Sequence, residues 1–225
     1  MRVACWGHFG VPVLLFPTGA ADYLDHERFL MLHKLEPLIE AGRIKVYTCD
    51  GITAEGWLNA NAHPAHKSWM QACFDRYLVA ELLPHIKDDC GGTTGIIASG
   101  ASIGAYNAVT AACRHPEWFS RVIGMSGTYA FDRWMSGFTD ANYYFSQPLY
   151  FVPRLQGPDL DALRQVHFVL AAGQGRAEAP EESRRMAEVL SARGVSVDLQ
   201  IWGPDVHHDW PTWRTWLPLF LDSAT

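Results

Sequence analysis

Ser102 lies at the centre of a G-x-S-x-G pattern that spans residues 100–104. The residues before it, 95–98, form an apolar run with branched side chains, and those after it follow an alanine-rich helical pattern. Ser102 is therefore expected where a strand turns abruptly into a helix, which is the setting of a nucleophile elbow. The flanking positions require glycine because a Cβ there would collide with the neighbouring strand or helix. The pattern predicts a serine in a strained backbone conformation, with its hydroxyl exposed.

A serine hydroxyl is a weak nucleophile at neutral pH and needs a base to accept its proton. His207 and His208 lie in the loop after the last predicted strand, at 197–201, where the base of a serine–acid–histidine order is expected. Spacing alone does not decide which of the two histidines is the base. His207 could instead cap a strand end or line a pocket. The His-His-Asp cluster could also bind a metal ion, but no second group of ligands supports that interpretation.

The acid that orients the base should follow the predicted strand at 166–171. Glu178 stays outside the helix that follows, and we predict it as the third member of the triad. Glu181 and Glu182 have another explanation, because carboxylates in the first turn of a helix favour its positive end. Two further alternatives are Asp132 and Asp205.

Acyl transfer also needs backbone N–H donors that stabilise the oxyanion. The N–H of Ile103, the residue after the nucleophile, is the first expected donor, and Ala20 in the loop at 18–20 is predicted to supply the second. Gly19 would let this loop approach the substrate closely.

The order of the predicted elements favours an α/β fold with a mostly parallel twisted sheet and helices on both faces. We expect one domain over residues 1–225, with an aromatic-rich excursion at about 128–163 near the active site, where long connections often have a function. The predicted strands are 3–6, 11–16, 43–49, 95–98, 122–125, 166–171 and 197–201. The predicted helices include 23–39, a long helix ending before Gly91, one after Ser102, one from Pro180 and one at 210–221.

The chain has 225 residues, a formal net charge of −6 and no basic stripe. This composition argues against nucleic acid or an anionic membrane surface as the main partner. The five cysteines are widely spaced, without a C-x-x-C pair, and are expected to be buried free thiols. With no apolar stretch of about 18 residues and no cleavable leader pattern, a cytoplasmic location is expected.

With these motifs together, the chain resembles the α/β-hydrolase esterases that include the esterase D-like and antigen 85-like enzymes. The matching segments are 11–22, 75–86, 96–127 and 206–221. The family's base histidine stands in a His-x-Trp-x-x-Trp pattern that maps onto residues 208–213, which favours His208. Many relatives carry His-Gly where this chain has Thr18-Gly19, and many carry the acid earlier than Glu178.

The resemblance implies a serine carboxylesterase that acts on small or medium acyl esters through an acyl-enzyme, without a metal or organic cofactor. Two rival hypotheses are an acyltransferase that uses the same triad and a non-catalytic binding protein with the hydrolase fold. Because both the serine and the histidine are present, the sequence favours catalysis.

Overall fold

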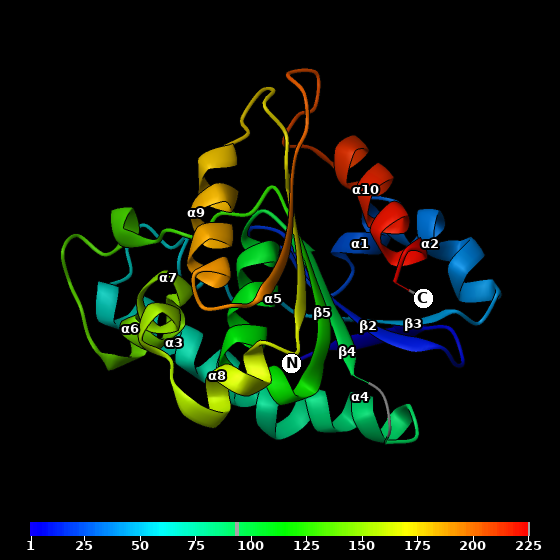
Figure 1. Ribbon diagram of the computed structural model, residues 1–225, viewed down its shortest axis with the longest axis horizontal. Coiled ribbons are helices and arrows are strands. Elements are labelled where there is room, and N and C mark those ends of the chain that lie inside the picture. The colour runs from blue at the N-terminus through cyan, green and yellow to red at the C-terminus, as the bar shows by residue number, and fades with distance from the viewer. Residues whose placement is uncertain (93–94, 225) are drawn as a thin grey trace.

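The computed structural model describes residues 1–92 and 95–224, which form a twisted sheet between two layers of helices (Figure 1). Within the described residues, seven strands pair in the order β1-β3-β2-β4-β5-β6-β7. β1 runs antiparallel to β3, and every other neighbouring pair is parallel, so the predicted sheet type is confirmed. The strands are β1 Val3–Trp6, β2 Val11–Phe16, β3 Ile44–Cys49, β4 Ile96–Ala101, β5 Phe119–Met125, β6 His167–Ala172 and β7 Ser196–Ile201.

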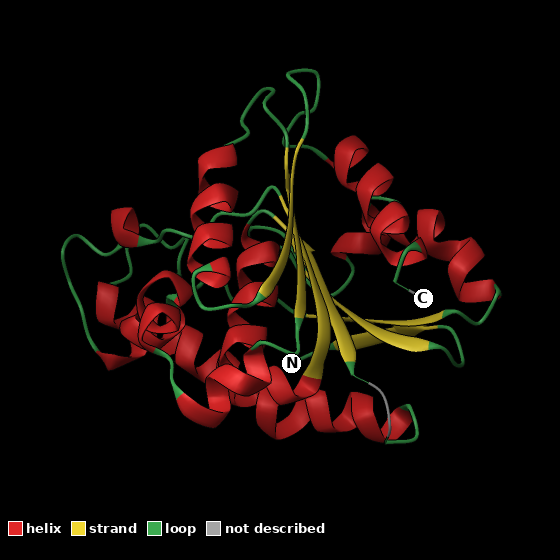
Figure 2. Ribbon diagram, viewed as in Figure 1, coloured by secondary structure: helices red, strands yellow, loops and turns green. Residues whose placement is uncertain are grey.

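Helices occupy most of the connections between strands (Figure 2). The α-helices are α1 Asp25–Arg28, α2 Met31–Glu40, α3 Pro64–Tyr77, α4 Leu83–Asp89, α5 Ile103–Arg114, α6 Ala141–Ser146, α7 Pro148–Phe151, α8 Gly157–Leu163, α9 Pro180–Ser191 and α10 Trp210–Asp222. A π-helical turn, η1 Leu78–Leu82, joins α3 to α4, and short 3₁₀ turns are η2 Pro116–Trp118, η3 Asp132–Trp134 and η4 Val152–Arg154. Among the residues described, no helix has the length and apolar character needed to cross a membrane.

The two faces of the sheet build two separate hydrophobic cores. Along β2, Leu14 and Phe16 enter one core and Val13 and Leu15 the other, because successive side chains of a strand point to opposite faces. Helices α5 and α9 cover the first face, whereas α2 and α10 cover the second (Figure 1). With both faces buried, the central strands carry nearly continuous apolar sequences.

The prediction of one helix over 23–39 was wrong, because the chain forms α1 and α2 with a break at Leu30. Leu30 has φ 61°, in the left-handed region that interrupts a right-handed helix. Next to the break, the ring of Phe29 stacks on Trp210 at the start of α10, with centroids 4.7 Å apart and planes 6° apart. The break between α1 and α2 thus lies beside a contact with a segment about 180 residues further along the chain. Helical periodicity carries no information about such a contact.

Aromatic side chains of the excursion at 128–163 build part of the first core. Tyr129, Phe131 and Tyr143 are buried, and the ring of Phe131 lies 4.2 Å from that of Tyr106 and 4.8 Å from that of Trp57. These rings therefore give the excursion a hydrophobic core, which is shared with α5.

The prediction of buried thiols holds for only part of the cysteine set. All five cysteines are free, but Cys5 is exposed and Cys73 and Cys90 are partly exposed. Only Cys49 and Cys113 are buried, and burial raises the pKa of the Cys49 thiol to about 12. No periodic pattern in the sequence distinguishes the position of Cys5, in a strand at the edge of the sheet, from a core position.

Candidate active site

Ser102 occupies the turn between β4 and α5. Its backbone has φ 56° and ψ −121°, and its N–H donates a hydrogen bond to Met125 O over 2.9 Å. A Cβ on Gly100 would lie 2.4 Å from the carbonyl carbon of Gly104, and one on Gly104 would lie 2.6 Å from Phe16 O. Both glycines are therefore needed for the strand and helix to approach this closely.

The ends of neighbouring parallel strands bring the other candidate residues toward this turn. Ala101 pairs with Met125, and Met125 pairs with Ala171, so the residues that follow these strands lie along one edge of the sheet. Ser126 begins the loop after β5 with φ 48°, and its N–H donates to Ala171 O over 2.7 Å. Loops at the carboxyl ends of parallel strands are the usual location of ligand sites in such sheets.

Glu178 is held between two polar groups at this edge. Its side chain is 1% exposed, and Oε1 accepts a hydrogen bond from Ser126 Oγ over 2.6 Å. Ser126 Oγ in turn accepts from Trp213 Nε1–H over 2.9 Å. Glu178 Oε2 has no hydrogen-bond partner among the described residues and lies 3.9 Å from His208 Nδ1. The carboxylate thus presents its one unsatisfied oxygen to the histidine.

His208 combines partial burial with a nearby carboxylate. Its side chain is 22% exposed and meets the ring of Trp213 edge-on, with centroids 5.1 Å apart. Burial lowers the pKa of His208 below 6.5, and the carboxylates of Glu178 and Asp209 partly oppose this shift. The imidazole is therefore neutral at neutral pH, the form that can accept a proton.

His207 contacts the neighbouring loop. Its Nδ1 accepts a hydrogen bond from the backbone N–H of Arg176 over 2.9 Å. The two adjacent histidines therefore have different partners, and Glu178 faces His208.

The structure brings Glu178 and His208 together but does not join Ser102 to the histidine by a hydrogen bond. Within residues 1–92 and 95–224, Ser102 Oγ has no hydrogen-bond partner. Catalytic hydrogen bonds are often long without substrate and tighten when it binds.

The loop at 18–20 lies beside the start of α5. A Cβ on Gly19 would be 3.2 Å from Leu58 Cδ1 and 4.0 Å from Ile103 Cγ2. Ile103 is the first residue of α5, where backbone N–H groups have no partner within the helix. The N–H of Ala20 instead donates to Thr53 Oγ1 over 3.0 Å, so this predicted donor is already hydrogen-bonded.

Asp25 anchors the same loop from α1. Asp25 Oδ2 accepts hydrogen bonds from both the N–H and the Oγ1–H of Thr18, each over 2.9 Å. The residue is 1% exposed, and burial raises the pKa of its carboxyl group, although the bonds from Thr18 act in the opposite direction. Thr18 thus links the loop to a buried carboxylate.

The other candidate acids have partners elsewhere. Glu182 Oε2 accepts from the backbone N–H groups of Tyr129 and Ala130 over 2.8 and 2.9 Å. Glu182 therefore fixes the start of the excursion, a role that its place in the first turn of a helix did not reveal. Glu181 pairs with Arg184 on the surface, Asp132 accepts from the hydroxyls of Tyr143 and Tyr150, and Asp205 is exposed.

Two histidines at the start of α3 are not part of this site. His63 caps the helix, since its Nδ1 accepts from Ala65 N–H over 3.2 Å, and His66 is exposed. Across the described residues, no group of three or more histidine, cysteine, aspartate or glutamate side chains is arranged to hold a metal ion.

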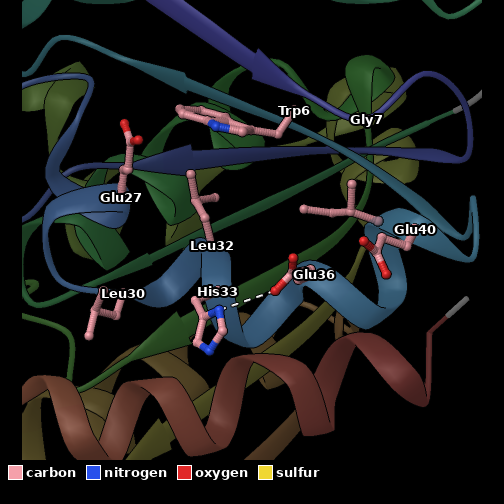
Figure 3. Close-up of a pocket in the computed structure, with 9 residues that line it drawn as sticks. Trp6, Gly7, Glu27, Leu30, Leu32, His33, Glu36 and Glu40 are labelled. Atoms are coloured by element: carbon pink, nitrogen blue, oxygen red, sulfur yellow. Dashed lines mark ion pairs between the residues drawn. The ribbon is translucent and has the colours of Figure 1, made fainter.

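Two cavities border the elements around the site. One of about 350 Å³ is lined by Ala20 and Ala21, together with polar side chains that include Arg2 and Asp50. A second, of about 430 Å³, lies between Trp6 and helices α1 and α2, where His33 Nδ1 pairs with Glu36 over 3.1 Å (Figure 3). The predicted site residues do not line this second cavity.

Sequence reasoning missed four polar residues that contact the predicted site residues or their loops: Asp25, Thr53, Ser126 and Trp213. Ser126 and Trp213 fall inside segments that carry the family resemblance, but the resemblance gives neither residue a role in the site. Their hydrogen bonds span 52 and 87 residues, and no local pattern signals contacts at such separations.

Comparisons with known proteins identify the family of the chain. The family model described as "Putative esterase" matches residues 10–223. A search among curated protein sequences gives no match.

Solved structures that resemble the chain share its α/β-hydrolase fold. A ferulic acid esterase has a TM-score of 0.69 and 18% identity over 96% of this chain and 85% of its own. MPT51 from Mycobacterium tuberculosis has a TM-score of 0.69 and 18% identity over 98% and 91%. An S-formylglutathione hydrolase from Agrobacterium tumefaciens has a TM-score of 0.66 and 16% identity over 96% and 83%. At these identities the likeness concerns the fold.

Proposed function

The chain belongs to the esterase family whose model it matches, and on that premise we propose that it is a serine carboxylesterase with Ser102, His208 and Glu178 as its triad. The observation that carries the proposal is the environment of Glu178. A buried carboxylate has one oxygen fixed by Ser126 and the other, otherwise unsatisfied, 3.9 Å from His208 Nδ1. Since burying an unpaired charge is costly, this arrangement suits a group that stabilises a histidine when it becomes positively charged.

The proposed reaction begins with attack of Ser102 Oγ on the ester carbonyl carbon. His208 Nε2 accepts the hydroxyl proton, and Glu178 stabilises the resulting imidazolium through Nδ1. The carbonyl electron pair moves to the oxygen, which the N–H groups of Ile103 and Ala20 stabilise. The tetrahedral intermediate collapses, the alcohol leaves with the proton from His208, and water then hydrolyses the acyl-enzyme by the same steps.

Ala20 must exchange its partner during this cycle. In the structure its N–H donates to Thr53 Oγ1, so the oxyanion would take the place of the threonine hydroxyl. The new acceptor carries a full negative charge, and hydrogen bonds to charged groups are stronger than those between neutral groups.

We propose small or medium acyl esters as the substrate class. Leu58 and Ile103 place apolar side chains beside Gly19, in the loop that carries the proposed donor Ala20. Apolar side chains at this position suit the acyl chain of a small or medium ester. A series of p-nitrophenyl esters of increasing acyl length tests this class, and kcat/KM is expected to fall for long chains.

A fluorophosphonate probe and p-nitrophenyl ester hydrolysis test the triad. Ser102→Ala should abolish labelling and lower kcat by about a million-fold, and His208→Ala should cause a comparable loss, because the two residues act as a unit. Circular dichroism should show both variants folded. Wild-type protein that is folded yet neither labelled at Ser102 nor active on any ester of the series would refute the proposal.

A further inference from the structure

Two loops at the carboxyl edge of the sheet are joined by backbone hydrogen bonds. They are the acid loop, 173–179, which carries Glu178, and the histidine loop, 202–209, which carries His208; they lie side by side in Figure 1. Gly175 N–H donates to Val206 O over 2.9 Å, and His208 N–H donates to Arg176 O over 3.1 Å. The relative position of the acid and the base therefore depends on how these loops are held together.

Gln174 Nε2 donates to Trp202 O over 2.7 Å, and His207 supplies a second side-chain contact in this junction. Its Nδ1 accepts the N–H of Arg176 over 2.9 Å, between the two backbone bonds. Arg176 is consequently bonded on both sides, by its N–H to His207 and by its carbonyl oxygen to His208. The imidazole thus completes a set of three bonds that ends at the base itself.

The glycines of the acid loop allow this close approach. A Cβ on Gly175 would lie 2.1 Å from His207 Nδ1, and a Cβ on Gly173 would lie 2.2 Å from Val206 O. Side chains at either position would push the loops apart. Glu178 N–H then donates to Gly175 O over 3.2 Å, so the acid follows directly from the segment that His207 contacts.

We propose that His207 is a positioning residue, which sets the Glu178–His208 geometry through its bond to Arg176 N–H. The inference rests on the proposed triad. This role requires a hydrogen-bond acceptor for Arg176 N–H at the position of Nδ1. The His207 ring is therefore the tautomer that carries its proton on Nε2. Its contribution is that of one hydrogen bond, which holds Glu178 Oε2 3.9 Å from His208 Nδ1, where the carboxylate orients the ring and stabilises the imidazolium.

Three substitutions separate this role from a general structural one. His207→Ala removes the acceptor. His207→Asn keeps an oxygen at the same number of bonds from Cα as Nδ1, whereas His207→Gln places its acceptor one bond further out. We expect kcat on a p-nitrophenyl ester to fall about tenfold in the alanine and glutamine variants, with KM within about twofold, and to recover in the asparagine variant.

The titration of His208, followed by NMR of its ring protons, supplies a readout that does not need turnover. It should change in His207→Ala and remain as in the wild type in His207→Asn. Unchanged kcat and unchanged titration in His207→Ala would overturn the proposal, as would a folded asparagine variant that fails to recover. Failure of the proposed function would appear differently, as ester hydrolysis that survives Ser102→Ala.

Discussion

Ser126 Oγ donates to Glu178 Oε1 over 2.6 Å and accepts from Trp213 Nε1–H over 2.9 Å, so one hydroxyl joins the proposed acid to α10. Ser126→Ala should lower kcat about tenfold while KM stays nearly constant, because the carboxylate loses a charge-assisted bond that holds its orientation. Steady-state kinetics on a p-nitrophenyl ester measures this loss. Trp213→Phe removes the donor to Ser126 together with part of the ring that contacts His208. Because Ser126 can still donate to Glu178 in this variant, a smaller loss is expected. A Ser126→Ala enzyme with unchanged kcat would show that Glu178 holds its position without the hydroxyl.

The acidic limb of the pH profile of kcat/KM should follow the protonation of His208. Burial holds its pKa below 6.5, and activity requires the neutral ring, so kcat/KM should stay high down to pH 6.5 and fall as pH decreases through the lowered pKa. In Glu178→Gln the carboxylate that raises this pKa is lost, and the falling limb should move to still lower pH. The same variant should lower kcat by roughly 10³ to 10⁴-fold. A limb that keeps its position in Glu178→Gln would mean that another group produces it.

Removing the hydrogen-bond partner of Ala20 N–H should raise kcat, whereas the substitutions above lower it. Thr53→Val keeps the shape of the side chain but removes the acceptor, which leaves the N–H free for the oxyanion. We expect kcat to rise up to about fivefold, the equivalent of one net hydrogen bond. Thr53→Ser retains the hydroxyl and should behave as the wild type. A lower kcat in the valine variant would count against Ala20 as an oxyanion donor and indicate that Thr53 holds the loop in place.

His26 should make the fold sensitive to acid. The residue is 2% exposed, its Nδ1 lacks a partner among the described residues, and burial lowers its pKa to about 3. The unfolded chain binds a proton at this residue from about pH 6.5 downward, and the folded chain does so only near pH 3. Stability should therefore fall by about 1.4 kcal/mol per pH unit within this window and be unaffected above it.

Urea unfolding at pH 7.5 and pH 5 measures this effect. His26→Leu should reduce the difference in unfolding free energy between the two pH values, whereas His33→Leu, at an exposed position, should leave it unchanged. Equal pH sensitivity in the wild type and His26→Leu would contradict the prediction.

Local sequence patterns predicted the sheet well. The bounds of β1 and β2 agree with the expected strands at 3–6 and 11–16, because each apolar run is bordered by glycine or proline. The start of α10 at Trp210 also agrees, with Asp209 capping the helix. These features depend on neighbouring residues alone, so the sequence contains all the information they require.

Contacts between distant segments explain what the sequence did not predict. The break at Leu30 lies next to the stacking of Phe29 on Trp210, and the bond from Ala20 to Thr53 joins separate loops. The place of Glu178 outside a helix predicts it as the acid, but its contact with Ser126 depends on the pairing of β5 with β6. Periodicity and motif spacing carry no information about such pairings.

The bonds from Glu182 to the backbone of Tyr129 and Ala130 have a consequence for protein engineering. They tie the first residues of the excursion to the helix that follows the proposed acid, while the ring of Phe131 beyond them packs against Trp57 and against Tyr106 of α5 in the first core. A chimera that replaces this segment with one from a relative should therefore keep residues 128–130 and join the foreign sequence after them. Such grafts would leave the contacts of Glu178 with Ser126 and His208 in place.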